Sequence, residues 1–377
     1  MHLTLHLTTA CNLRCDYCYS PPRPGPPMTE DVARRALELA AAGATRAAGI
    51  VLFGGEPLLH PELIVSIVAR ARAMTRSGAV PFHFKVTTNG VLLDDAFVRF
   101  AVQEDVSVAV SCDGIREAHD LHRRLLNGGP SYAEVRGGLL RLLRAKPYSP
   151  VLMVVRPDTA RWLTESVSEL LELGCRYLVV SLDHAAGWDE AGFEELARQY
   201  DALGRHYVAW TRAGRKFYLS PFEVKIGTHL DECRYRADRC ELGTRQLSVD
   251  PSGKLYPCVQ FTRAGPTSSW CVGDVETGIS TASLARIRAH AAAEHQPCRA
   301  CAIRQRCNHT CGCLNWQATG SVNEVSEVLC RSERMLVPIA DRIGAELFQE
   351  RNALFLHKHY NPAWPLLSLL EETKGWS

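Results

Sequence analysis

Three cysteines near the start of the chain have the spacing of ligands to a metal cluster. Cys11, Cys15 and Cys18 form a C-x3-C-x2-C triplet directly after Leu3–Thr8, which alternates polar and apolar residues as a strand does. Three thiolates on one loop can hold three irons of a [4Fe–4S] cube and leave the fourth iron open. Zinc favours a closed site of four ligands, but the next cysteine is Cys112. The triplet therefore favours an iron–sulfur cluster with an open iron.

Ten further cysteines lie between residues 233 and 330, which is enough for two more sites of four thiolates each. Cys240 and Cys258 flank residues 247–256, where a Pro-Ser-Gly turn predicts a hairpin that brings both thiols together. Spacing alone leaves structural zinc and iron–sulfur clusters as alternatives, because four thiolates serve either metal, and the first triplet favours iron. By a resemblance described below, eight of them are the expected ligands, namely Cys233, Cys240, Cys258, Cys298, Cys301, Cys307, Cys311 and Cys330.

Four cysteines are left over. Cys112 and Cys175 lie in or beside predicted strands and are interpreted as core residues, since free buried cysteine is common. Cys313 follows Cys311 in a Cys-Gly-Cys segment and is an alternative ligand to one of the eight. Cys271 has no assigned role.

Polar and glycine residues follow several predicted strands. Gly54 and Gly55 would let the backbone approach a ligand closely, and Glu56 can accept hydrogen bonds from a cationic amine. Two roles remain open for the residues at the next strand ends, ligand contact and turn capping. Arg123 and Arg156 are competing candidates to bind a carboxylate. The residues at those next strand ends are Asn89, Ser111 and Asp113.

Alternating strands and helices in the first half of the chain predict a parallel α/β fold. Six strands fall short of the eight of a closed barrel, so the expected fold is a partial (β/α)6 TIM-like barrel, open on one side, with functional residues at the carboxyl ends of its strands. The predicted strands are Leu3–Thr8, Ile50–Phe53, Phe82–Thr87, Val106–Ser111, Val151–Val155 and Tyr177–Leu182. The predicted helices are 29–43, 61–76, 94–102, 131–145 and 161–173.

The composition changes after this half, which divides the chain into four expected parts. They are a barrel domain (1–185), a helical linker (186–229), a cysteine-rich domain that metal would hold together (230–335), and a C-terminal helix with a tail (336–377). The helix is expected to begin near Arg331 and to end near Arg351.

Charge and hydropathy exclude several classes of protein. The formal net charge of the 377 residues is +2, which gives no argument for nucleic acid or an anionic membrane as partner. No apolar run is long enough to span a bilayer, and the N-terminus lacks the features of a signal peptide. The expected location is the cytoplasm. Because its reducing conditions disfavour disulfides, the clustered cysteines among the 15 are interpreted as metal ligands or catalytic groups and not as bridges.

The triplet and the strand-end motifs resemble the radical SAM superfamily. The points of likeness are C-x3-C-x2-C with Tyr17 before its last cysteine, Gly54-Gly55-Glu56, and Ser111-x-Asp113-Gly. The resemblance implies that the three cysteines hold a [4Fe–4S] cluster whose open iron binds S-adenosylmethionine (SAM). It also implies that reductive cleavage of SAM gives a 5′-deoxyadenosyl radical. The implied SAM-binding residues are Tyr17, Gly54, Gly55, Glu56, Asn89, Ser111, Asp113 and Arg123.

The C-terminal cysteines resemble the seven-cysteine pattern of SPASM domains, which extend peptide-modifying radical SAM enzymes. The pattern runs from Cys240 to Cys330, and Cys233 adds an eighth ligand. By this resemblance the chain carries two auxiliary [4Fe–4S] clusters. The first would be held by Cys233, Cys240, Cys258 and Cys311, and the second by Cys298, Cys301, Cys307 and Cys330.

The resemblance makes a peptide or protein the expected substrate, in ribosomal peptide maturation, cross-linking or side-chain oxidation. Flavodoxin or ferredoxin would supply electrons. Formylglycine-forming members carry an aspartate after the hairpin cysteine, where this chain has Val259, which argues against sulfatase maturation. The chain starts on its first strand, so the expectation is either a separate leader-binding protein as a further partner or recognition of the substrate by the C-terminal tail.

Two alternatives stay open, a radical SAM enzyme that acts on a small molecule or cofactor precursor, and a non-catalytic iron–sulfur electron carrier. Intact Cys11, Cys15 and Cys18 argue against the carrier, which needs no open iron. The catalytic base is not identified, and His309, Asp183 and His184 are its candidates because histidine and strand-end carboxylates can move protons.

Overall fold

The computed structural model describes residues 1–20, 25–230, 242–244, 246–291 and 295–361. Their strands form one eleven-stranded sheet and a small two-stranded sheet. The large sheet has the order β13-β12-β11-β10-β1-β3-β4-β5-β7-β8-β9, and the small one pairs β2 with β6. The strands are β1 (His2–His6), β2 (Leu13–Cys15), β3 (Ala48–Phe53), β4 (Phe82–Thr88), β5 (Val106–Ser111), β6 (Arg123–Leu125), β7 (Pro150–Val155), β8 (Tyr177–Leu182), β9 (Tyr218–Leu219), β10 (Gln246–Val249), β11 (Lys254–Tyr256), β12 (Gly273–Asp274) and β13 (Gly278–Ile279).

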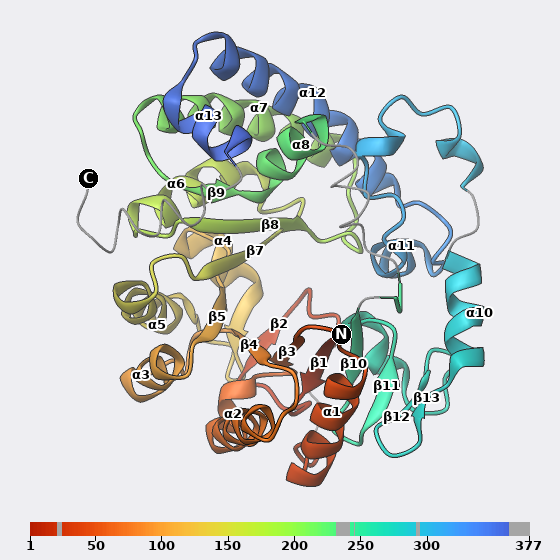
Figure 1. Cartoon of the computed structure of the whole chain (residues 1–377). Coiled ribbons are helices and arrows are strands. Elements are labelled where there is room, and N and C mark those ends of the chain that lie inside the picture. The colour runs from red at the N-terminus through yellow and green to blue at the C-terminus, as the bar shows by residue number, and fades with distance from the viewer. Residues whose placement is uncertain (21–24, 231–241, 245, 292–294, 362–377) are drawn as a thin grey trace.

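Helices cover the outer side of the sheet, which curves as an arc that is open on one side (Figure 1). All pairs from β10 to β9 are parallel, and the pairs among β10, β11, β12 and β13 are antiparallel. The α-helices are α1 (Glu30–Ala42), α2 (Pro61–Arg76), α3 (Asp95–Gln103), α4 (Arg116–His122), α5 (Tyr132–Ala145), α6 (Leu163–Glu172), α7 (Glu190–Arg212), α8 (Ser220–Leu230), α10 (Thr281–Ala291), α11 (Gly312–Thr319), α12 (Glu327–Gln349) and α13 (Ala353–Tyr360). Short 3₁₀ turns are η1 (Pro57–Leu59), η2 (Ala160–Trp162), η3 (Val259–Ala264), η4 (Gln296–Cys298) and η5 (Arg304–Arg306).

Local sequence signals account for most of these bounds. The side chains of Thr29, Asp94 and Asp189 accept from backbone N–H groups in the first turns of α1, α3 and α7, so each begins at a residue that satisfies its free donors. Along β3 every second residue is buried, as the two faces of a strand require. The six strands predicted from the sequence are present within two residues of their expected ends, and the partial α/β barrel is confirmed.

The C-terminal part extends the same sheet. Strand β10, the first strand of the expected hairpin, pairs in parallel with β1, with Gln246 opposite His2. The segment expected to be a linker, residues 186–229, contains the 23-residue helix α7, whose buried side chains include Phe193, Tyr200 and Tyr207. Helix α12 lies against α7 and α8. These packed contacts join the four expected parts, whose boundaries stay predictions.

His6 on β1 gives the protein a pH-dependent term in its stability. Its side chain is fully buried edge-on against Phe53, and burial lowers the pKa of His6 to about 4. Protonation therefore favours the unfolded chain, where the pKa of histidine is near 6.5. Stability from this group is complete above pH ~6.5 and falls as the pH drops to ~4, by roughly 3 kcal/mol in total. We expect the unfolding free energy of the His6→Leu variant to change less between pH ~6.5 and pH ~4 than that of the wild type. If the unfolding free energies of wild type and variant fell equally with pH, His6 would not be the group responsible.

In the part of the chain that the structure describes, no helix combines the length and apolar character needed to cross a membrane.

Candidate functional site

The first cysteine triplet lies after the carboxyl end of β1, inside the arc of the sheet (Figure 1): Cys11 precedes β2, Cys15 ends it and Cys18 follows it. Strand β2 pairs with β6, which places Cys15 opposite Arg123. The backbone N–H of Cys18 donates to the carbonyl of Cys15 at 3.2 Å, so the loop turns back on itself between these two ligand candidates. The three cysteines are half-buried. The structure thus places the three cysteines in one short segment that the pairing with β6 and this hydrogen bond hold in place.

The surroundings of the triplet suit thiolates that bind iron. The backbone N–H of Leu13 lies 3.4 Å from the sulfur of Cys11, and the amide Nδ2 of Asn89 lies 3.7 Å from it. N–H donors of this kind tune iron–sulfur clusters. Burial raises the pKa of all three thiols, that of Cys15 to about 11, so binding of a metal must displace their protons.

Among the described residues, no group of three or more histidine, cysteine or acidic side chains is gathered as around a metal ion. In a cube each thiolate binds a different iron atom, which spreads the ligands apart. Three thiols are a donor set that suits such a cluster, and Cys11, Cys15 and Cys18 would hold it.

Glu56 fixes the strand-end motifs to one another. Its carboxylate is fully buried and accepts from the hydroxyl of Thr88 at 2.7 Å and from the backbone N–H groups of Asn89 and Leu58 at 2.7 and 2.9 Å. Burial raises its pKa, and these donors oppose that change. The amide of Asn89 in turn donates to Asn12 beside Cys11 at 2.7 Å. Glu56 therefore connects the turn after β3, the end of β4 and the cysteine loop.

The two glycines before Glu56 allow the backbones to approach closely. Gly54 has φ +135°, and a Cβ on it would lie 2.4 Å from the carbonyl oxygen of Thr8. A Cβ on Gly55 would lie 2.0 Å from the carbonyl oxygen of Ala10, immediately before Cys11. Glycine is required at both positions because the cysteine loop runs directly against this turn.

Tyr17, Asp113 and Arg123 form one buried hydrogen-bonded group. The hydroxyl of Tyr17 donates to the carboxylate of Asp113 at 2.5 Å and accepts from Nη1 of Arg123 at 2.8 Å. Burial raises the pKa of Asp113, although the charge of Arg123 opposes this. The Nε of Arg123 is buried and has no hydrogen-bond partner among the residues described here. The guanidinium thus keeps a donor for an acceptor atom of a ligand.

The other predicted residues are divided between the site and its supports. Ser111 is half-buried at the end of β5, next to the Asp113 segment. Arg156, which competed with Arg123 in the sequence, donates to the buried carboxylate of Asp183 at 2.6 Å. Arg156 is therefore paired with Asp183, which is one of the three candidate bases.

His122 is a residue that the sequence did not single out. Its ring is buried between two carboxylates, with Nδ1 3.2 Å from Asp16 in the cysteine loop and Nε2 3.0 Å from Asp158 after β7. Asp158 also lies 3.7 Å from Nε of Arg156. A polar chain therefore runs from the first cysteine loop to Asp183. No sequence pattern marks it, because its members come from four separate segments.

The remaining candidate bases are both buried. The ring of His309 packs edge-on against that of His295, with ring centroids 6.0 Å apart. Burial lowers the pKa of His184, which lies close enough to Cys311 and Asp183 to feel their charges. Nδ1 of His184 has no hydrogen-bond partner in the described part of the chain.

The second set of cysteines also has neighbours of its own kind. Cys258 and Cys313 hydrogen-bond to each other, and the sulfurs of Cys311 and Cys313 are 3.5 Å apart. Cys298 lies within electrostatic reach of Cys301 and Cys330, as Cys307 does of Cys330. Cys233 and Cys240 lie outside the described residues.

One arginine ties the first cysteine loop to the C-terminal cysteines. Nη1 of Arg263, in η3 just after Cys258, donates to the carbonyl of Tyr19 at 3.1 Å. The same guanidinium stacks on Trp316 of α11, with its carbon 5.0 Å from the ring centroid. Tyr19 directly follows Cys18, and burial together with Cys18, Cys258 and Cys313 raises its pKa. The two cysteine regions are therefore in direct contact.

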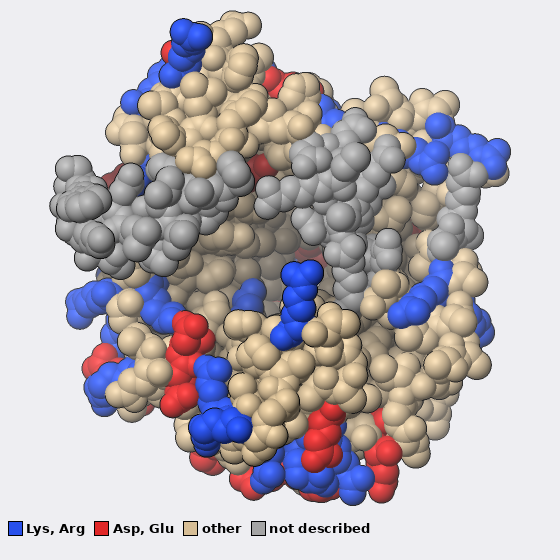
Figure 2. Space-filling model, in the orientation of Figure 1, with Lys and Arg blue, Asp and Glu red and all other residues tan. Residues whose placement is uncertain are grey.

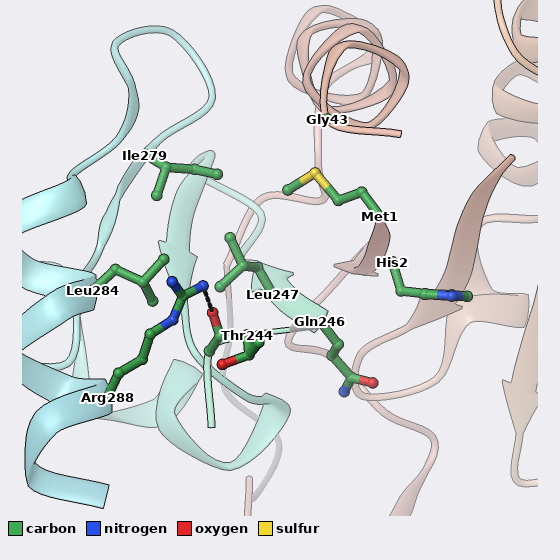
Figure 3. A pocket seen from close by; sticks show the side chains of 10 residues that line it. Met1, His2, Gly43, Thr244, Gln246, Leu247, Ile279, Leu284 and Arg288 are labelled. Carbon is green, nitrogen blue, oxygen red and sulfur yellow. Dashed lines mark hydrogen bonds between the residues drawn. The ribbon is translucent and has the colours of Figure 1, made fainter. Parts of the chain in front are cut away.

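The molecular surface offers two hollows of different kinds. Figure 2 shows a hollow at the centre of the face that Figure 1 presents, with a mainly uncharged visible floor and a Lys or Arg side chain at its lower edge. A pocket of about 560 Å³ lies at the opposite strand ends, between α1, β10 and α10 (Figure 3). It is lined by Met1, His2, Gln246, Leu247 and Arg288, among others, and contains none of the candidate cysteines. The candidate functional motifs thus lie at the carboxyl ends of the strands, away from this pocket.

Comparison with known proteins agrees with this geometry. Residues 5–170 match the model of the Radical SAM superfamily. The chain is 28% identical over 272 residues to the serine-type anaerobic sulfatase-maturating enzyme of Klebsiella aerogenes, which covers 68% of this chain. The match spans 65% of the relative, just under two thirds of its length.

Two solved structures share the fold. The native structure of anSMEcpe with bound AdoMet superimposes with a TM-score of 0.80 at 19% identity, over 92% of this chain and 99% of that one. SuiB of Streptococcus suis bound to its precursor peptide SuiA gives a TM-score of 0.60 at 14% identity, over 87% and 75% of the two chains. The match thus extends past residue 170 into the cysteine-rich C-terminal part.

Residues 5–170 of this chain are therefore similar to the radical SAM superfamily. The sequence relatives that it matches over most of its length include anaerobic sulfatase-maturating enzymes, and its structural neighbours include a protein solved with a precursor peptide.

Proposed function

We propose that this protein is a radical SAM enzyme that cleaves SAM reductively and abstracts hydrogen from a peptide or protein. The observation that carries the proposal is the cysteine triplet on a pinned loop at the carboxyl end of β1, packed against Gly54 and Gly55. When bound at Cys11, Cys15 and Cys18, a [4Fe–4S] cluster would supply the electron that breaks a C–S bond of SAM to give a 5′-deoxyadenosyl radical.

The chain's own residues would position SAM. The close approach of the glycine turn to the cysteine loop leaves backbone groups to face the ligand, while Glu56 keeps the turn in place. The buried Nε of Arg123, which has no hydrogen-bond partner among the described residues, would donate to an anionic group of SAM, and Tyr17 with Asp113 holds that guanidinium. Asn89 and Ser111 complete the proposed set at the ends of β4 and β5.

Two auxiliary [4Fe–4S] clusters would be held by the C-terminal cysteines. Cys258 and Cys311 come together beside the first cysteine loop, which supports the first auxiliary site, completed by Cys233 and Cys240. The mutual proximity of Cys298, Cys301, Cys307 and Cys330 supports the second. An electron left on the substrate would leave through the nearer auxiliary cluster. A flavodoxin or ferredoxin in the cytoplasm would supply the electron that reduces the first cluster.

The substrate class rests on the relatives, which mature sulfatases, and on the neighbour solved with a precursor peptide. Val259, at the start of η3, directly follows Cys258 and cannot accept a proton as aspartate does at the corresponding position of formylglycine-forming enzymes. We therefore propose ribosomal peptide maturation or cross-linking over sulfatase maturation, with a separate leader-binding protein as a partner. His184, His309 and Asp183 remain the proposed proton acceptors.

The test is anaerobic incubation of the iron-reconstituted protein with SAM and dithionite. We expect 5′-deoxyadenosine, detected by mass spectrometry, from the wild type and none above background from the Cys11→Ala, Cys15→Ala, Cys18→Ala variant. The Cys175→Ala variant removes a buried thiol outside the site and should retain the activity. A fully iron-loaded wild type that forms no 5′-deoxyadenosine would contradict the proposal.

A further inference from the structure

A third thiol, Cys313, lies at the first auxiliary site although the eight proposed ligands do not include it. Its sulfur is 3.5 Å from that of Cys311, and it also shares a hydrogen bond with Cys258. All three side chains are buried, with 6–8% of their surface exposed. Burial of a thiol against two proposed ligands calls for a role at the metal site.

The local fold holds Cys313 in this place. The Cys-Gly-Cys segment forms the start of α11, and a Cβ on Gly312 would lie 3.2 Å from Leu242 and 3.3 Å from Val322, so a small residue suits this position. Asn315 is fully buried and donates to the carbonyls of His309 and Val322, which fixes the first turn of the helix. The sulfur of Cys313 is thus directed toward its two neighbours by packing.

The spacing of the sulfurs distinguishes a ligand from a donor. Thiolates that bind different irons of a cube stand apart, whereas Cys311 and Cys313 are in contact at 3.5 Å. A thiol retains one S–H group and can donate it to a neighbouring sulfur. Hydrogen bonds to the sulfurs are among the factors that set the potential of such clusters, because they stabilise the extra negative charge of the reduced state.

We propose that Cys313 stays a thiol and donates a hydrogen bond to a ligand sulfur of the first auxiliary cluster, and thereby keeps the reduction potential of that cluster higher than it would otherwise be. This inference rests on the proposed function, since it requires the cluster. It makes Cys313 a positioning and tuning residue, in contact with Cys258 and Cys311.

The experiment measures iron content and midpoint potential together. Cys313→Ala and Cys313→Ser are prepared in the Cys11, Cys15, Cys18→Ala background, so that only auxiliary clusters contribute to the EPR signals of an anaerobic redox titration. Cys271→Ala is the matched control, because Cys271 is a half-buried cysteine of the same region whose sulfur lies 3.5 Å from the carbonyl of Gly273.

We expect all these variants to retain the iron and sulfide content of their parent. The potential of one auxiliary signal should move to a more negative value in Cys313→Ala, and less so in Cys313→Ser, whose hydroxyl can still donate. The Cys271→Ala control should leave both potentials unchanged. Loss of one cluster's iron in both Cys313 variants would identify Cys313 as a ligand and overturn the proposal, as would an unchanged potential at full iron content. A parent that binds no iron would contradict the proposed function itself.

Discussion

Replacing Glu56 with glutamine is expected to lower the free energy of unfolding by about 2–4 kcal/mol. The carboxylate is fully buried and accepts three hydrogen bonds, from Thr88, Asn89 and Leu58. An amide has one oxygen, so its NH2 group would face at least one of these donors. A buried donor that loses its acceptor costs the full energy of its desolvation.

The loss should extend to the cysteine loop, because Asn89 connects Glu56 to Asn12 and Cys11. Chemical denaturation of wild type and variant under identical conditions measures the change. Glu62→Gln is the matched control, since Glu62 is an exposed acid in the first turn of α2, and we expect a change within about 0.5 kcal/mol. An equally small change for Glu56→Gln would show that the buried hydrogen bonds contribute little.

Replacing Lys225 with methionine is expected to destabilise the protein by about 3–5 kcal/mol. Lys225 on α8 and Glu333 on α12 are a buried ion pair, 2.5 Å apart, with 4% and 6% of their surfaces exposed. The ammonium also donates to the carbonyl of Arg306, immediately before Cys307, at 3.0 Å. Without the cation, the carboxylate of Glu333 would be buried with its charge uncompensated.

A double-mutant cycle separates the cost of an uncompensated buried carboxylate from the net contribution of the ion pair to the free energy of unfolding. Because a buried ion pair and an apolar pair of similar volume differ little in stability, Lys225→Met with Glu333→Leu should recover most of the loss. Strictly additive losses would rule out the explanation. Arg198→Met breaks an exposed pair with Glu195 and should cost no more than about 1 kcal/mol.

Six strands of the large sheet, the helices α1, α2, α3, α5 and α6, and the cysteine motifs could be predicted from the sequence, because each depends on residues close together in the chain. Alternation of apolar residues marks β1 and β3, and side-chain caps mark the starts of α1, α3 and α7. The spacing of the C-x3-C-x2-C triplet alone keeps its three thiols near one another, since they lie in one short segment of the chain. The α/β class followed from the order of these elements.

Tertiary structure alone decided which distant residues meet. The pairing of β10 with β1 joins residues more than 240 positions apart, and nothing in either strand encodes that choice. The same holds for the hydrogen bonds of Glu56 to the end of β4, the contact of Tyr17 with Asp113, and the position of His122 between two carboxylates. Local patterns determine which side of an element is buried, whereas the partner on that side is selected by the packing of the whole chain. For this reason the sequence was enough to propose ligands for the first cluster, and the structure was needed to show what holds these cysteines in place and that Cys313 lies beside Cys258 and Cys311.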